Sequence, residues 1–575
     1  MDRISILDGV SGMASTEGIS GSGARYDSLY FDYVHHPFEL PPEMRGDAPV
    51  HQVVVAGAGP VGLTVALELA RRGIEVVVLE EDDTVNRGSR AVGTARRSLE
   101  IFERIGAGTR FVETGVSWKG GRSYYRDKLV LDFQVQQDPR LKHPPMVSLA
   151  QCHVEQYLYE ALRAYPNVSL RWSSRLEHVE QDGERVTARV HTPSGSYALH
   201  AQWLVACDGG RSAVRRSLGK ELRGSVYEGR YLIVDIQMRS KEPPGRRVWF
   251  DPPAFPGATI IMHKQPFDIW RIDYQLLPEE DLEQEIQPKR VRERVTEFLA
   301  SIGETADWQI DWISPYRAHS LTLDDYRDGR VLFAGDAAHL VPIFGARGMN
   351  GGVDDAHNLG WKLAWVAAGQ APPALLDTYS IERVDAARQN MALAEKSTRF
   401  MTPPTRGHAV MQEAVLSLAV SEAFVRELIN PRQVTELRMT GSSLRLADDG
   451  SFGHGPAPGA VCPNLPCGAS AGGTVFLHDR LGRDFTLLAF GDAGLGDKSR
   501  RLDALRASMG VPFGIDAVAL DDAGIAGAFD VRPGTAYLVR PDGHVMARWR
   551  AWEPETVLPC LVRAVRGKEE LDHAG

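Results

Sequence analysis

The spacing of apolar and polar positions changes character several times along the chain. From residue 52, QVVVAGAGPVGLTVALELARRGIEVVVLEED gives an apolar run, a glycine turn, apolar residues at helical spacing, and a second apolar run. This order predicts a β-α-β unit with a parallel sheet. Helical spacing recurs in TARRSLEIFERIG and in CHVEQYLYEALRAY at 152–165, which predicts two more helices.

The middle of the chain alternates apolar and polar residues in the manner of strands. The alternation covers residues 167–205 and continues over 225–320, where YLIVDIQM, ATIIMH and DIWRIDYQLL are the strand candidates. One helical piece near 283–302 interrupts them. This texture predicts antiparallel strands. A long helical region then follows over 348–440, with a break at TPP (402–404).

The C-terminal part of the chain has a pattern of its own. FTLLAFG, DKSRRLDALRASMG, IDAVAL and TAYLVRPDGHVMARW alternate strands and helices, whereas GDAGLGDK (491–498) is expected to be a loop. The predicted segments are a loosely packed N-terminal extension (1–50), a first α/β segment with inserted strands (51–225), a β-sheet domain (226–320), a continuation of the first domain with a helical region (321–445), a linker (446–475) and a small α/β domain (476–575).

Composition and charge exclude several classes of function. The net charge of −10, without a lysine or arginine stripe, argues against nucleic-acid binding. No apolar stretch is long enough to span a membrane, and the N-terminus lacks the apolar core of a secretory signal, so we expect a cytoplasmic protein. Five cysteines argue against a disulfide framework. Cys462 and Cys467 have no second pair of metal-ligand spacing nearby, so no metal site is expected.

The glycine turn after the first apolar run predicts a dinucleotide site. Gly57, Gly59 and Gly62 permit a tight turn, close approach of the backbone to a pyrophosphate, and packing of a helix on a strand. The helix N-terminus supplies N–H groups and a positive dipole end. Glu80 closes the second apolar run, where a carboxylate can accept hydrogen bonds from an adenosine ribose. The fingerprint does not distinguish NAD from FAD, and a tight turn in another α/β fold is the alternative.

Two further motifs combine an aspartate with small residues. RVLFAGDAAHLVP places Gly335 and Asp336 at the end of an apolar run, before several glycines and a helical pattern. So little side-chain bulk indicates a large ligand against the backbone, while a helix N-cap is the alternative role of Asp336. LVACDGGRSAVRRSLG carries the second pair, Asp208 and Gly209.

With GAGPVGL as the first, these motifs resemble the three fingerprints of the single-component flavoprotein aromatic hydroxylases, in the family's order and spacing. The resemblance is strongest over residues 50–400, and the whole chain resembles the phenol hydroxylase and 3-(3-hydroxyphenyl)propionate hydroxylase branch. It implies an α/β protein with a Rossmann-like FAD-binding domain, an α+β substrate domain built on a β-sheet, and a C-terminal thioredoxin-like domain. That domain has no C-x-x-C, so redox activity is not expected there. In relatives it supports packing and dimer contacts, which implies a homodimer.

The resemblance also implies how non-covalent FAD is held. Asp336 would hydrogen-bond the ribityl chain, and the small residues beside it would let the cofactor approach the backbone. Pro342 and the Gly345–Gly348 loop would lie beside the isoalloxazine. The next helix, starting near Met349 and Asn350, would direct its N-terminal N–H groups at the part of the reduced flavin that carries negative charge.

The remaining implied contacts come from the Asp-Gly motif and its surroundings. That motif would serve the FAD pyrophosphate region and the reduced nicotinamide cofactor. Arg211 and Arg215 suit phosphate contacts, the motif's own fold or structural ion pairs. The residues implied in cofactor binding are Gly57, Gly59, Pro60, Gly62, Glu80, Arg90, Gln151, Asp208, Gly209, Gly335, Asp336, Pro342, Gly348, Met349 and Asn350.

The implied reaction is hydroxylation of a phenolic ring in the catabolism of an aromatic acid. NADPH or NADH reduces FAD, O2 adds at flavin C4a, and the hydroperoxide transfers its distal oxygen to the ring. The protein would exclude water and encourage loss of the phenol proton, because a phenolate is the better carbon nucleophile. The candidates for that proton are His263, Asp273, Tyr274, Tyr316 and His319, of which we favour His263 and Tyr274. Sheet packing is the alternative role of Tyr274, and a plain polar position on a strand is the alternative role of His263.

Three arginines suit other roles in the same reaction. Arg271 and Arg317 suit a substrate carboxylate, and Arg347 occupies a flavin-side position where many relatives carry Gln or Lys. His263, Tyr274 and Arg347 are therefore the catalytic candidates. The alternatives are a tailoring monooxygenase of a polycyclic or heteroaromatic natural product, a non-oxygenating flavin dehydrogenase or oxidase, and a flavin-binding protein without turnover.

Overall fold

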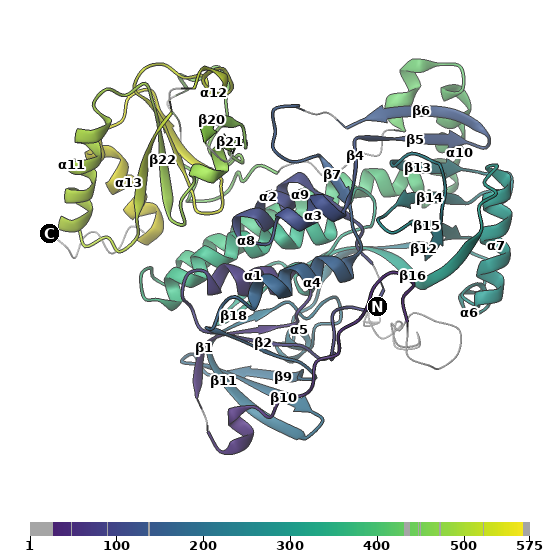
Figure 1. The fold of residues 1–575 in the computed structure, drawn as a ribbon, viewed down its shortest axis with the longest axis horizontal. Coiled ribbons are helices and arrows are strands. Elements are labelled where there is room, and N and C mark those ends of the chain that lie inside the picture. The colour runs from purple at the N-terminus through teal and green to yellow at the C-terminus, as the bar shows by residue number, and fades with distance from the viewer. Residues whose placement is uncertain are drawn as a thin grey trace.

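The glycine turn follows the central strand of a parallel sheet, as the sequence predicts (Figure 1). The computed structural model describes residues 27–47, 49–88, 90–135, 138–429, 437–446, 448, 450–470, 473–520 and 522–566. In it β1 (Val50–Ala56) pairs in parallel with β2 (Val76–Leu79) and β11 (Gly195–Ala206), within the order β17-β18-β11-β1-β2-β8. The remaining strands are β8 (Val168–Arg171), β17 (Arg327–Asp328), β18 (Val331–Phe333) and the antiparallel hairpin β9 (Arg175–Gln181) and β10 (Val186–Thr192), which extends β11.

Helices are stacked on one face of this sheet (Figure 1). The predicted helical region after residue 348 has the break at 402–404 and a second break over 368–374, beside two prolines. No helix among the described residues is both long and apolar enough to cross a membrane. The helices of this part are α1 (Pro60–Ala70), α2 (Arg96–Arg104), α3 (Thr109–Thr114), α4 (Gln151–Leu162), α5 (Ala213–Ser217), α8 (Gly348–Ala367) and α9 (Leu375–Met401). Helix α10 (Arg406–Ala419) and the 3-10 helix η4 (Ala423–Leu428) pack against the second sheet instead.

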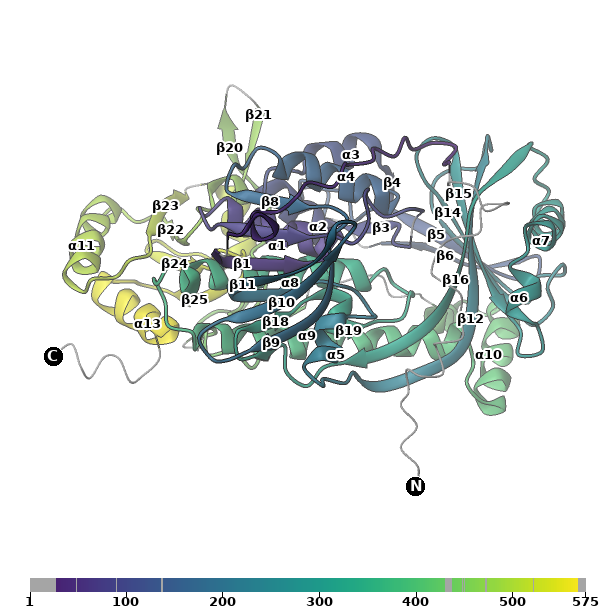
Figure 2. The same cartoon turned by 90° about the horizontal axis from the view of Figure 1, so that it is seen from below.

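The predicted β-sheet domain is a second sheet, at the opposite end of the molecule from the C-terminal unit (Figure 2). Its order is β19-β16-β12-β15-β14-β13-β5-β6, antiparallel except where β13 pairs with β5. Helices α6 (Leu282–Glu285) and α7 (Pro288–Ser301) cover one face. The strands are β5 (Gly120–Tyr125), β6 (Lys128–Gln134), β12 (Arg223–Met238), β13 (Arg246–Phe250), β14 (Thr259–Lys264), β15 (Ile269–Leu276), β16 (Trp308–Thr322) and β19 (His339–Leu340).

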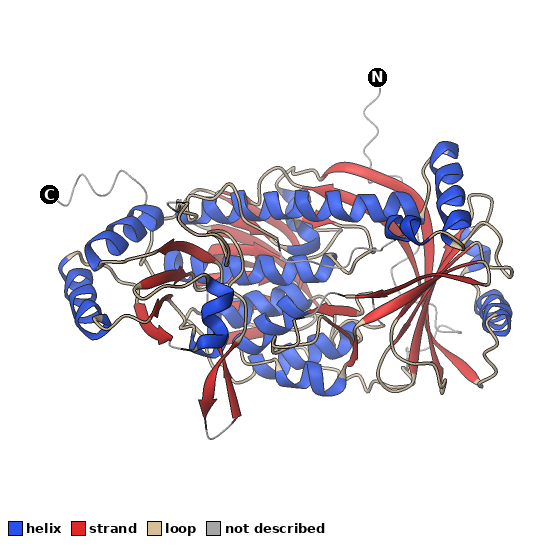
Figure 3. Cartoon of the chain, turned by 90° about the horizontal axis from the view of Figure 1, so that it is seen from above, coloured by secondary structure: helices blue, strands red, loops and turns tan. Residues whose placement is uncertain are grey.

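The C-terminal unit has its own sheet, in the order β23-β22-β24-β25 (Figures 1 and 3). The stretch GDAGLGDK is only partly the expected loop, because α11 begins within it at Leu495. The elements are β20 (Pro466–Ser470), β21 (Gly473–Phe476), the 3-10 helix η5 (Leu477–Arg480), β22 (Phe485–Phe490), α11 (Leu495–Ser508), β23 (Ile515–Leu520), α12 (Ala523–Phe529), β24 (Thr535–Val539), β25 (Val545–Trp549) and α13 (Pro554–Arg566).

The described part of the N-terminal extension packs on the rest of the chain, contrary to the loose packing expected for it. The backbone N–H of Leu29 donates to Asp311 at 2.6 Å, and the rings of Tyr30 and Phe31 lie 5.8 and 4.9 Å from that of His153. Residues 1–26 of the extension lie outside the described residues. The remaining elements are the 3-10 helices η2 (Pro42–Arg45) and η3 (Gly335–Ala337) and the small sheet of β3 (Gly93–Ala95), β7 (Met146–Ser148) and β4 (Val116–Trp118).

Buried charges attach the C-terminal unit to α8 and α9. Arg540 of that unit donates two hydrogen bonds to Glu382, at 2.6 and 2.8 Å, and Lys362 reaches the same carboxylate at 2.7 Å. Asp542 accepts from the Trp361 ring N–H at 3.2 Å. All these charged groups are almost fully buried, so each depends on its partners rather than on water.

Replacing Glu382 with alanine tests this attachment. Arg540 and Lys362 would lose a shared carboxylate inside the protein, so we expect a loss of about 3–5 kcal/mol in the free energy of unfolding, measured by urea denaturation. Glu395→Ala is the matched control on the same helix, because its pair with Arg399 is solvent-exposed and should contribute at most about 1 kcal/mol. Equal effects of the two changes would contradict the prediction.

Candidate functional site

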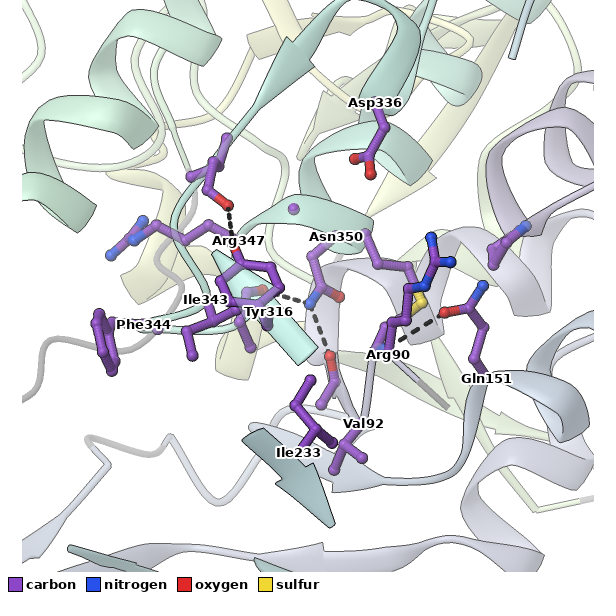
Figure 4. Close-up of a pocket in the computed structure, with 18 of the residues that line it drawn as sticks. Arg90, Val92, Gln151, Ile233, Tyr316, Asp336, Ile343, Phe344, Arg347 and Asn350 are labelled. Carbon is purple, nitrogen blue, oxygen red and sulfur yellow. Dashed lines mark hydrogen bonds between the residues drawn. The ribbon is translucent and has the colours of Figure 1, made fainter. Parts of the chain in front are cut away.

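A cavity of about 370 Å³ opens where the parallel sheet, the second sheet and the start of α8 meet (Figure 4). It brings residues of all three motifs together with residues of the second sheet. The predicted residues that line it are Gly59, Pro60, Arg90, Gln151, Gly209, His263, Arg271, Asp273, Tyr316, His319, Asp336, Arg347, Gly348, Met349 and Asn350. Much of the remaining wall is apolar and includes Val92, Ile233, Ile261, Ile343 and Phe344.

Several predicted cofactor residues do not line the cavity, but they allow the segments next to it to pack closely. A Cβ on Gly57 would lie 2.5 Å from the Cys207 carbonyl oxygen, and one on Gly62 would lie 2.0 Å from the Gly57 carbonyl oxygen. A Cβ on Gly335 would lie 2.9 Å from Val61. These glycines therefore let three backbone segments approach one another closely. Pro342 also lies outside the lining, although both its neighbours belong to it.

Glu80 fixes the glycine turn from the end of β2. Its carboxylate accepts hydrogen bonds from the backbone N–H groups of Ala58 at 2.7 Å and Asp82 at 3.1 Å. Burial raises the pKa of Glu80 to about 7. The residue does not line the cavity, so its contact with a ribose stays a prediction.

The Asp-Gly motif is held by its own side chains. Asp208 accepts from the Val214 backbone N–H at 3.1 Å, while its Oδ1 is buried without a hydrogen-bond partner among the described residues. The buried Arg215 donates to the carbonyl oxygens of Ala337, at 3.0 Å, and Gly210. Of the three roles left open for Arg215, support of the motif's own fold is the one that the geometry favours.

Asp336 points into the cavity, near Arg90 (Figure 4). Its side chain is open to the cavity, whereas protein surrounds it on the other sides, and this burial raises its pKa above the ordinary value. Gln151, on the same side, accepts from the Ala91 backbone N–H at 3.3 Å and donates to Glu155 at 2.9 Å.

Helix α8 begins at the cavity without a side-chain cap. Its first residues line the cavity, and their backbone N–H groups have no partner within the helix. Asn350 lines the cavity, but its amide is already used: it donates to the carbonyl oxygens of Gly93 at 2.8 Å and Ala346 at 2.6 Å, and accepts from the Ala95 N–H at 2.8 Å. Arg347 is buried beside it and donates to Asn390 of α9 at 3.0 Å.

A row of four polar side chains crosses the second sheet on the cavity side. His263 pairs with Arg271, and Arg271 with Asp235, in the strand register. The pairing of Arg247 with Met262 places Arg246 next to His263 on the same face. Arg271 donates to both oxygens of Asp235, at 2.8 and 2.9 Å, so it does not have the free guanidinium that a substrate carboxylate would need.

His263 is neutral in this row. Burial, and then the charges of Arg246 and Arg271, lower its pKa to about 3. Its ring lies 6.3 Å from that of Trp118, centroid to centroid. A group with so low a pKa is a weak base at neutral pH.

Asp273 lies two residues along β15 from Arg271, in a second row on the same face. Its neighbours across the strands are Ile261 and Ile233. Burial raises its pKa to about 7, partly offset by Arg271. Its Oδ1 has no hydrogen-bond partner among the described residues. Asp273 is thus a carboxyl group that changes charge near neutral pH inside the cavity.

Tyr274 is not in the cavity, which corrects the prediction for it. Successive residues of a strand face opposite sides, so Tyr274 packs under α7 against Phe255, whose ring centroid is 6.4 Å away. Arg317 is likewise outside the lining. Tyr316 and His319 do line the cavity, and the Tyr316 hydroxyl donates to the Val341 carbonyl oxygen at 3.4 Å.

Comparison with known proteins agrees with this geometry. The family described as FAD binding domain matches residues 50–394. A protein of Mycolicibacterium gilvum named 3-(3-hydroxy-phenyl)propionate/3-hydroxycinnamic acid hydroxylase is 32% identical over 444 residues, 77% of this chain and 74% of that protein. This chain belongs to the single-component flavoprotein aromatic hydroxylases. A relative of the same name from Mycolicibacterium smegmatis is 34% identical over 366 residues, 63% of this chain, which spans 64% of that relative's length.

A solved structure shares the fold over most of its length. The ternary complex of aklavinone-11 hydroxylase with FAD and aklavinone has a TM-score of 0.73 and 25% sequence identity, and the match covers 90% of this chain and 99% of that one. Together with the family match, this makes FAD the cofactor of the chain. The thioredoxin-like character of the C-terminal unit stays a prediction.

The cavity of this chain suits FAD on its own features. A Cβ on Gly348 would meet no atom within 4 Å, and one on Gly59 would meet only Glu155 Oε1, at 4.0 Å, so both glycines leave room for a ligand. The exposed carboxylate of Asp336 and the uncapped start of α8 offer an acceptor and donors on the same wall. These groups would hold the cofactor.

Replacing Gly62 with alanine tests the close packing behind the flavin site. The new Cβ would overlap the Gly57 carbonyl oxygen and force the turn apart, so we expect at least about a tenfold weaker retention of FAD, measured as flavin per protein after purification. Gly496→Ala, in α11, is the control, because its Cβ would meet no atom within 4 Å. A Gly62→Ala protein with full flavin and an unchanged melting temperature would contradict the prediction.

Proposed function

We propose that this chain is an FAD- and NAD(P)H-dependent monooxygenase that hydroxylates a phenolic acid in aromatic catabolism. The observation that carries the proposal is Asp273, a carboxyl group with a pKa near neutrality on the wall of the flavin cavity. The names of the relatives, 3-(3-hydroxy-phenyl)propionate/3-hydroxycinnamic acid hydroxylases, support a phenolic acid. When bound, FAD supplies the electrons taken from the nicotinamide cofactor and activates O2.

Asp273 is the residue we propose to take up the phenol proton. Its carboxylate form can accept a hydrogen bond from the phenol, and loss of that proton makes the ring more electron-rich. The isoleucines on both sides of Asp273 exclude water from this proton transfer. The start of α8 would stabilise negative charge on the opposite side of the cavity.

The other two catalytic candidates fit less well. His263, with a pKa of about 3, is a far weaker base than Asp273, and Tyr274 lies on the other face of the sheet. Arg347 stays a candidate for positioning the flavin-side loop, because it lines the cavity and is fixed to α9. The homodimer and the choice between NADPH and NADH stay predictions.

A tailoring monooxygenase is the second candidate function. The structure of aklavinone-11 hydroxylase, a complex with aklavinone, supports it at the level of fold. The buried charged groups on the cavity wall favour a small polar aromatic instead.

Anaerobic flavin reduction tests the proposed reaction. We expect a phenolic acid such as 3-(3-hydroxyphenyl)propionate to accelerate reduction by NADPH or NADH, measured by stopped-flow absorbance, and to yield a hydroxylated product in air. Reduction that stays slow with every phenol tested would favour a bulky natural-product substrate. Fast reduction without any aromatic compound would favour a dehydrogenase or oxidase.

Asp273→Asn tests the proton acceptor. The base must be deprotonated to act, so wild-type kcat/KM should rise as pH increases through about 7 and fall away below it. The variant should lose this rise and about 100-fold or more of kcat/KM at pH 8, where Asp273 is ionised in the wild type. Phenols of lower pKa should restore part of the rate, because they ionise without help.

His263→Gln is the matched comparison in the same cavity. Its pKa of about 3 lies below the measured range, so the rise through about 7 should persist whatever the absolute rate. A pH profile that survives in Asp273→Asn but disappears in His263→Gln would reverse the assignment.

A further inference from the structure

Arg246 is the unbalanced charge of the cavity wall. The residue is only 4% exposed, its Nη1 has no hydrogen-bond partner among the described residues, and no described carboxylate forms an ion pair with it. Burial lowers its pKa only to about 10, so it stays charged at neutral pH. A buried guanidinium without a partner is costly, and such groups are usually paired or face a ligand.

The neighbours of Arg246 do not provide that partner. Along the polar row, His263 is neutral, and Arg271 and Asp235 neutralise each other through two hydrogen bonds. Asp273, in the next row, attracts Arg246 electrostatically but forms no ion pair with it. The row therefore carries one positive charge that is available to an anion.

Arg246 also lies at the boundary of a second cavity. This outer cavity, of about 350 Å³, is lined by β4, β5, β6 and the start of β13 with the turn before it, and it shares only Trp118 and Arg246 with the inner one. Lys119, Arg122 and Asp132 line it, and Arg122 pairs with Asp132 at 3.2 Å, so its wall is polar. An anionic group at Arg246 would thus lie between a polar outer cavity and the apolar wall around Asp273.

We propose that Arg246 binds the carboxylate of the substrate and so selects phenols that carry an acidic side chain. The guanidinium can hold a carboxylate with two parallel hydrogen bonds, while the ring lies on the isoleucine side of the cavity. The inference rests on the proposed function, since it assigns the anionic end of a phenolic substrate. It does not depend on which residue accepts the phenol proton.

A matched pair of ligands tests this role in the oxidised FAD-bound protein. We would measure Kd for 3-(3-hydroxyphenyl)propionate and for its uncharged amide, by calorimetry or by the change in flavin absorbance. Wild-type protein should bind the acid about 10- to 100-fold more tightly, as expected for a charge-assisted contact. Arg246→Met should reduce this ratio to about 1–3 with little change for the amide, and Arg246→Lys should restore part of it.

Arg247→Met is the control variant. Arg247 is the next residue, is also buried and lines only the outer cavity, where it pairs with Glu242 at 2.6 Å. It should keep the wild-type preference for the acid. A preference that survives in Arg246→Met, or is absent from the wild type, would overturn the proposal, and so would a wild type that binds neither compound.

Product analysis separates this inference from the proposed function. Hydroxylation of the amide as efficiently as the acid, with equal affinities, would leave the monooxygenase proposal intact and remove the role of Arg246. Tight, Arg246-dependent binding of the acid without hydroxylated product would do the reverse. Retained FAD and an unchanged melting temperature in Arg246→Met would show that the loss of affinity is not a folding defect.

Discussion

The arrangement of the site depends on one buried carboxylate, that of Asp355 in α8. It accepts hydrogen bonds from the Gly335 backbone N–H at 3.1 Å, from His339 at 2.8 Å and from Arg383 of α9 at 2.6 Å. Although burial alone would raise the pKa of Asp355, Arg383 and His339 hold it below its ordinary value. The Gly-Asp segment, α8 and α9 are thereby fixed to one point, and Asp336 and the start of α8 face the same cavity.

The cavity then combines two walls with different physical character. The wall from the parallel sheet presents backbone, glycines and a helix start, which suit a cofactor with phosphates and an anionic ring. The wall from the second sheet presents two rows of side chains, one charged and one apolar apart from Asp273. Because the rows are only two residues apart along each strand, a small aromatic ring can contact both at once.

The local parts of this structure could be predicted from the sequence, and the long-range parts could not. The β-α-β unit and the strands of the second sheet follow from the spacing of apolar residues and from turns, which involve near neighbours in the chain. The three motifs are also short stretches, and their assignment follows from their resemblance to the family's fingerprints. Most motif residues predicted to bind FAD line or support the cavity. The sequence did not show that Glu80 and Asp208 accept hydrogen bonds from backbone N–H groups of their own motifs, because these contacts depend on the folded turns.

The misplacement of Tyr274 has a simple cause. Adjacent residues of a strand face opposite sides, and DIWRIDYQLL has polar side chains on both, so the sequence does not say whether Asp273 or Tyr274 faces the cavity. Arg246 was missed because it begins a short strand, next to a second arginine, and its position beside His263 becomes evident only from the pairing of β13 with β14. The stretch RRVWF does not alternate polar and apolar residues, so no signal in the sequence indicated the face of Arg246.

The length of α8 has a consequence for exchanging parts between related proteins. The helix has 20 residues and is about 30 Å long. It begins at the flavin cavity, and Asn358 and Trp361 in its second half contact Asp542 of the C-terminal unit. The start of α8 helps to form the flavin cavity, and its second half holds the C-terminal unit. Both belong to one continuous helix, so they cannot move independently. A chimaera that took the C-terminal unit from another family member would have to bring the matching second half of α8 and Glu382 with it, or the helix would be displaced at the flavin end as well.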